Sequence, residues 1–122
     1  MVTLEALNNR GAGKLPGHLG IVFTQAGASE LVGELALKEV LMAPNGYLHA
    51  GTIVTLADTT CGYGSFANLP EGATGFTTIE LKSNHIGTAR DGTIVSRATP
   101  VHLGRTIALF RCTQLILYPK QG

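Results

Sequence analysis

Several features are scarce in this sequence, and each scarcity excludes a class of protein. Charged residues make up only 14% of the 122 residues, against 44% hydrophobic residues, which excludes an intrinsically disordered chain. The net charge of +1 argues against a nucleic-acid partner or an anionic membrane surface. Tryptophan is absent and aromatic residues are only 6%, so base-stacking platforms for single-stranded nucleic acid are not expected.

Thiols and targeting signals are scarce as well. Cys61 and Cys112 form neither a CxxC pair nor a zinc spacing, and we interpret them as reduced, mostly buried thiols. The histidines also lack tight metal spacing, so neither a metal nor a cofactor is predicted. No secretory signal is visible, and no apolar run reaches the ~18 residues that span a membrane. A cytoplasmic protein without a membrane partner is therefore expected.

What is present fits one domain covering residues 1–122, because no repeat or low-complexity stretch divides the chain. With so few charges, the chain carries more apolar surface than one small core readily hides. Burial between subunits is the natural outlet for that surface, so a homo-oligomer is expected.

The order of the expected elements indicates an α+β fold. A short helix is predicted at residues 2–9, and a helix of about 18 residues is predicted from 49 to 67. Alternation and turn residues predict strands at residues 17–25, 30–40, 74–86, 93–102 and 106–118. The long helix is rich in Thr and Gly, which are poor helix formers. We therefore expect burial to stabilise it, inside a curved antiparallel sheet of about five or six strands.

Asp58 is the most informative residue of the long helix. Between Val40 and Pro70 it is the only Asp, Glu, Lys or Arg, so no basic residue can pair with it along the helix. An unpaired carboxylate on a mostly apolar helix is costly to bury, which makes Asp58 a candidate for catalysis. An Asp that faces a solvated groove, or that bonds Thr59 or Thr60, accounts for the pattern equally well.

The start of the same helix offers a second set of groups. The first N–H groups of a helix lack internal partners and carry partial positive charge. Gly51 leaves its N–H open to a polarised carbonyl oxygen, although tight packing against a strand would also explain a glycine there. His49 lies nine positions before Asp58, and about 100° per residue places these side chains on opposite sides of the helix. A site that uses both therefore requires two chains.

The segment from Asn45 to Asp58 resembles the signature of the PaaI-like hotdog thioesterases. This family includes the phenylacetate-pathway enzyme and one class of 4-hydroxybenzoyl-CoA thioesterase. Its pattern is Gly-x-x-His-Gly-Gly followed seven residues later by Asp or Glu, and Gly46, His49, Gly51 and Asp58 fit it. The resemblance implies a hotdog fold, hydrolysis of an acyl-CoA thioester, and a dimer with two interfacial sites that usually pairs into a tetramer.

The resemblance also implies roles for individual residues. Asp58 would be the general base or the nucleophile, and the Gly51 N–H would bind the thioester oxygen. His49 would orient the loop or the carbonyl, and Thr77 matches a residue that positions water. The residues matched to CoA contacts are Gly104, Arg105 and Thr106 in one turn, with Arg90 as a further candidate, because a cation suits phosphate.

Three positions depart from the family pattern. Ala50 replaces the first Gly after the His, a small change that should keep the backbone path. Members often carry Asn or Gln six residues before the His, where this chain has Ala43, so Asn45 is the candidate substitute for holding the carbonyl. Gly62 stands where some members have Ser or Thr one turn after the carboxylate, which leaves water positioning to a residue such as Thr77.

Other functions stay open on the sequence alone. A hotdog hydratase or dehydratase also pairs a His with a carboxylate, but the spacing here fits thioesterases better. A non-catalytic acyl-CoA binding protein would explain Ala43, whereas the retained Asp58 argues against it. Cys61 as a nucleophile, with His49 as its base, is disfavoured by their opposite helix faces and by the lack of a nearby cation.

Overall fold

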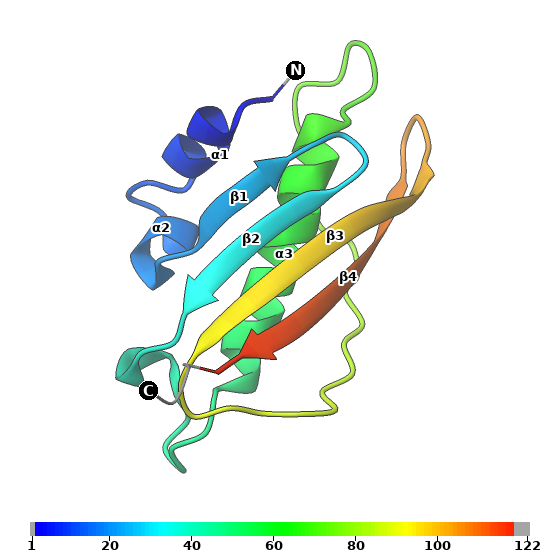
Figure 1. Cartoon of the computed structure of the whole chain (residues 1–122). Helices are drawn as coiled ribbons and strands as arrows, with labels where there is room; N and C mark the ends of the chain where they lie inside the picture. Colours follow the sequence, from blue (N-terminus) through cyan, green and yellow to red (C-terminus); the bar gives the residue numbers. More distant parts are fainter. Residues whose placement is uncertain (1, 119–122) are drawn as a thin grey trace.

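The chain folds into a layer of helix packed on a layer of sheet, as the computed structural model describes for residues 2–118 (Figure 1). Its helices in that range are α1 (Leu4–Arg10), α2 (Leu15–Leu19), the 3₁₀ helix η1 (Glu39–Leu41) and α3 (Ala50–Ala67). Its strands are β1 (Val22–Ala26), β2 (Leu31–Ala36), β3 (Thr93–Leu103) and β4 (Ala108–Leu117). None of these helices is long and apolar enough to cross a membrane.

The four strands form one antiparallel sheet in the order β1-β2-β3-β4. The β3–β4 pairing is the longest, and it runs from Thr93 opposite Leu117 to Leu103 opposite Ala108. The chain leaves the sheet after β2, forms α3 across one face, and returns to β3 (Figure 1). Beyond β1, the Asn8 side chain of α1 accepts from the Phe23 N–H at 2.8 Å and donates to the Phe23 carbonyl at 3.2 Å.

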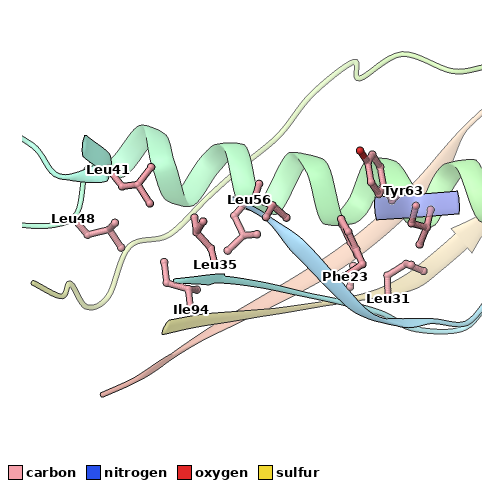
Figure 2. Close-up of a cluster of buried hydrophobic side chains, with 11 residues drawn as sticks. Phe23, Leu31, Leu35, Leu41, Leu48, Leu56, Tyr63 and Ile94 are labelled. Carbon is pink, nitrogen blue, oxygen red and sulfur yellow. The ribbon is translucent and has the colours of Figure 1, made fainter. Parts of the chain in front are cut away.

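The hydrophobic core lies between α3 and the sheet (Figure 2). Leu56 of α3 is fully buried beside Leu35 of β2 and Ile94 of β3. Phe23 and Tyr63 stack with ring centroids 4.7 Å apart. Burying one such side chain contributes about 2 kcal/mol, so packing explains how a helix of low intrinsic propensity is stable.

Three small or polar residues of α3 have a structural use. The Thr52 hydroxyl donates to the Leu41 carbonyl at 2.9 Å, and the Thr60 hydroxyl lies 2.7 Å from the Leu56 carbonyl. A side chain at Gly64 would come within 2.6 Å of the Phe110 ring, so this glycine lets the helix approach β4 closely. Residues that weaken the helix by propensity therefore also position it against its neighbours.

The α+β layering and the long helix are confirmed, but the predicted number of strands is wrong. Residues 74–86 form no strand, and the sheet has four strands instead of five or six. Ile79 of this segment is 80% exposed and Ile86 is fully exposed. Alternation alone cannot make a strand, because a strand also needs a neighbour to complete its hydrogen bonds. The predicted strand from residue 17 is also wrong at its start, where α2 extends to Leu19.

Candidate active site

Asp58 lies in the third turn of α3 with its side chain exposed. Its Oδ1 accepts a 2.8 Å hydrogen bond from the Thr78 hydroxyl, and no bond to Thr59 or Thr60 forms. Among residues 2–118, Thr78 is the one hydrogen-bond partner of this carboxylate, so Oδ2 is open to solvent. The carboxylate is thus oriented through one oxygen while the other is available for chemistry.

The contact to Asp58 comes from the segment at 74–86, which runs beside α3. One turn further along the helix, a side chain at Gly62 would come within 3.4 Å of the Phe76 ring. Thr78 makes this contact, whereas Thr77, the residue matched to water positioning, does not. In extended backbone, neighbouring side chains point in opposite directions, so only one of the two threonines can face α3. Thr77 is exposed and has no bond to Asp58.

His49 is the N-cap of α3, and its ring folds back over the helix start. The Nδ1 atom accepts the Gly51 N–H at 2.7 Å. A side chain at Gly51 would lie 2.9 Å from that nitrogen, so glycine makes room for the imidazole. A neutral ring whose Nδ1 accepts carries its proton on Nε2, which leaves a donor facing outward. The N–H predicted to bind a carbonyl oxygen is therefore occupied by His49, and a substrate must compete for it.

Asn45 also serves the backbone in this structure. Its Oδ1 accepts the Tyr47 N–H at 3.1 Å, inside a turn closed by a 2.7 Å bond from the Ala43 N–H to the Tyr47 carbonyl. Gly46 occupies the left-handed region at φ +87°, which the turn requires. Asn45 therefore shapes the loop that leads to His49, and its side-chain oxygen is already engaged.

A cationic side chain packs against this loop. The Arg90 guanidinium stacks over the Tyr47 ring at 4.3 Å, and the Leu48 N–H bonds the Ala89 carbonyl at 2.8 Å. A shallow groove of about 560 Å³ follows the loop; it is lined by Lys38, Glu39, Met42, Ala43, Pro44, Gly46 and Arg90. Two cations and one carboxylate give it a positive balance beside the helix start.

The predicted site residues fall into separate places within one chain. Gly51 and Asp58 are seven residues apart, which is about 10 Å along a helix at its usual rise. The turn that holds Gly104, Arg105 and Thr106 lies at the end of the molecule where α3 finishes (Figure 1), whereas Arg90 precedes the other end of β3. This turn is closed by a 2.9 Å bond from the Gly104 N–H to the Ile107 carbonyl. In the described part of the chain, no group of His, Cys, Asp or Glu could hold a metal ion.

Comparison with known proteins identifies the family to which the chain belongs. The thioesterase superfamily model matches residues 45–113, the stretch that runs from the His49 loop into β4. The 1,4-dihydroxy-2-naphthoyl-CoA hydrolase of Escherichia coli is 35% identical over 105 residues, which is 84% of this chain and 75% of that protein. The proofreading thioesterase EntH of Cronobacter sakazakii is 31% identical over 121 residues, 99% of this chain and 85% of that one.

Solved structures agree with the fold. A Haemophilus influenzae thioesterase superposes with a TM-score of 0.88 at 30% identity, covering 95% of this chain and 80% of that chain. A Pseudomonas aeruginosa thioesterase gives 0.89 at 26% identity, with 95% and 84% covered. With α3 packed on its antiparallel sheet and the family match spanning the His49 loop and Asp58, this chain belongs to the thioesterase superfamily and has its hotdog fold.

Proposed function

We propose that this thioesterase hydrolyses an acyl-CoA thioester to the free acid and CoA, with Asp58 as the group that drives the reaction. The observation that carries the proposal is the exposed Asp58 carboxylate, fixed at Oδ1 by Thr78 and open at Oδ2. The nature of the substrate is suggested by the E. coli relative, whose name specifies an aromatic acyl-CoA. The retained Asp58 favours turnover over the alternative of acyl-CoA binding without catalysis.

Two routes use the same carboxylate. As a general base, Asp58 takes a proton from water while the water oxygen attacks the thioester carbonyl carbon. As a nucleophile, it attacks that carbon itself and forms an anhydride, which water then opens to regenerate the carboxylate. In both routes the C–S bond breaks and CoA leaves as a thiolate that takes up a proton.

The helix start supplies the other half of the site. Negative charge develops on the carbonyl oxygen, and the Gly51 N–H at the positive end of α3 would stabilise it once the His49 ring moves aside. The Nε2–H of His49 would be a second donor for the same oxygen. Asn45 shapes the loop that presents these groups.

The site needs a second chain, because Asp58 lies too far from Gly51 on the same helix. We infer a dimer in which the helix start of one chain faces Asp58 of the other, and pairs of such dimers would make a tetramer. The CoA phosphates would then meet Arg90 at the helix start. Arg105, in the turn with Gly104 and Thr106, would approach from the other chain.

A thiol-release assay over aromatic and medium-chain acyl-CoA substrates tests the reaction. The Asp58→Ala variant should lose at least ~100-fold in kcat, because it removes the base or nucleophile. Glu71→Ala is a matched control, since Glu71 is also an exposed carboxylate near α3 but has no place in the site. An Asp58→Ala variant as active as the parent would refute the assignment.

Complementation tests the two-chain site separately. A Gly51→Val chain and an Asp58→Ala chain should each be inactive alone. When the two are co-expressed, the mixed dimer contains one site with both defects and one intact site, so activity returns. Absence of recovery in a purified mixed dimer would place both groups in a site within one chain.

A further inference from the structure

A chain of polar side chains crosses the interface between α3 and the sheet, and it includes none of the groups assigned to thioester hydrolysis. Thr60 Oγ1 of α3 lies 3.0 Å from Ser96 Oγ of β3, and Ser96 Oγ lies 3.1 Å from the Cys112 sulfur of β4. Cys61 of α3 follows Thr60 directly and lies close enough to Cys112 for the two thiols to shift each other's pKa. The two cysteines of the sequence, 51 positions apart, therefore meet in the fold.

The register of the sheet explains the meeting. Cys112 is paired with Ala98 of β3, whose side chain is fully buried, so both point toward α3. Cys61 follows Thr60 on the helix, and Thr60 already contacts the sheet through Ser96. Both sulfurs are only partly buried, and β4 is the last strand of the sheet. Since neither cysteine is fully buried, the pair is accessible to a small oxidant.

We propose that Cys61 and Cys112 form a reactive dithiol site that a hydroperoxide oxidises to a disulfide, which joins α3 to β4. The Cys112 thiolate attacks one peroxide oxygen, the O–O bond breaks, and water and a sulfenic acid form. The Cys61 sulfur then attacks the Cys112 sulfur, an S–S bond forms, and a second water leaves. Overall, two thiols are oxidised by two electrons and one hydrogen peroxide is reduced to two waters.

The opposite pKa shifts of the two thiols indicate which sulfur attacks the peroxide. Hydrogen bonds from the thiol of Cys61 and then from Ser96 and Gln114 lower the pKa of Cys112 to about 7. A substantial fraction of Cys112 is therefore thiolate at neutral pH, which is the reactive form. The bond to Cys112 and burial raise the pKa of Cys61, so this thiol is the resolving partner.

The bridge would act on the helix turn that follows Asp58, because Cys61 is three residues further along α3. It would fix that turn to β4 and slow local opening of both elements. This site uses none of the groups assigned to thioester hydrolysis and does not rest on that assignment.

Mass spectrometry of the full chain, reduced and then titrated with hydrogen peroxide, tests the site. The expected product has lost two hydrogen atoms, recovers them with dithiothreitol, and yields a tryptic link between the peptides 39–82 and 112–120. Hydrogen exchange of α3 and β4 amides should slow in the oxidised form. Cys61→Ala is the matched control, in which Cys112 should take up oxygen atoms instead of closing a bridge.

Three results would overturn the proposal. One is uptake of oxygen on Cys112 of the parent chain while Cys61 stays a free thiol. Another is a disulfide that links two chains instead of the two peptides of one chain. The third is a parent chain left unchanged at a peroxide dose that oxidises the Cys61→Ala variant.

Discussion

The cap formed by His49 at the start of α3 can be weighed by substituting Gly51. An alanine there would place its methyl carbon 2.9 Å from Nδ1 and 3.0 Å from Cε1 of the imidazole, so the ring must swing out and the 2.7 Å bond is lost. Loss of an N-cap bond costs about 1 kcal/mol. Replacing Gly by Ala within a helix stabilises the folded state by roughly 0.5–1 kcal/mol. The two effects nearly offset, so Gly51→Ala alone should change the free energy of unfolding by less than about 0.5 kcal/mol.

The effects separate in a double-mutant cycle with His49→Ala. That variant loses the cap and should be less stable by about 1 kcal/mol. In the His49→Ala background nothing obstructs a methyl group at Gly51, so the second substitution should stabilise by its full helix-propensity term. The coupling energy of the cycle should therefore be about 1 kcal/mol, a difference of several degrees in Tm for a domain of this size.

Thermal and urea unfolding of the four proteins, followed by circular dichroism, measures this coupling. Protein concentration must be fixed, because the stability of an oligomer depends on it. Equal stabilisation by Gly51→Ala in both backgrounds would show that the imidazole does not occupy the helix start. The account of Gly51 as a residue that makes room for His49 would then be wrong.

Three further outcomes follow from contacts described above. Thr78→Val should lower kcat by less than Asp58→Ala does, with the folded state intact by circular dichroism, and unchanged kinetics would remove Thr78 from the site. Leu56→Ala should lower the free energy of unfolding by about 2–5 kcal/mol in urea titrations, because it empties a fully buried position; a loss under about 1 kcal/mol would contradict that packing. Alkylation of Cys112 by iodoacetamide should accelerate about tenfold per pH unit below its lowered pKa of about 7 and level off above it, whereas a rate that still climbs at pH 9 would contradict the lowered pKa.

Sequence reasoning located the elements whose signals are local. Apolar spacing predicted α3 to within one residue, and turn residues marked the β3–β4 hairpin. It missed α2, although Pro16 in the first turn and Gly20 at the C-cap with φ +93° are the usual signals of a short helix. The strand predicted at 74–86 failed because periodicity reports only which side chains alternate, and the presence of a pairing partner is a tertiary property.

In the candidate site, too, local features were visible in the sequence and tertiary contacts were not. Asp58 was visible in the sequence as the one charged residue between Val40 and Pro70, but the structure exposes its carboxylate instead of burying it, and its catalytic role stays a prediction. The bond from Thr78 was not predicted, because the direction in which the side chains of an extended segment point depends on where that segment meets the helix. The cap by His49 had no signal at all, since Ser, Thr, Asp and Asn are the usual N-cap residues.

The Asn8 side chain has a consequence for how the sheet can grow. Its amide offers one donor and one acceptor to Phe23, as a residue of a neighbouring strand would, and so it blocks pairing of a further strand at Phe23. The opposite edge has no such terminator among residues 2–118, because β4 is simply the last strand in the order. The two edges of the sheet therefore differ: the β1 edge is blocked, and the β4 edge can still accept a strand. Misassembly by strand addition would proceed from β4 and stop at β1, so copies of the chain could join edge to edge in pairs but not in an endless fibre.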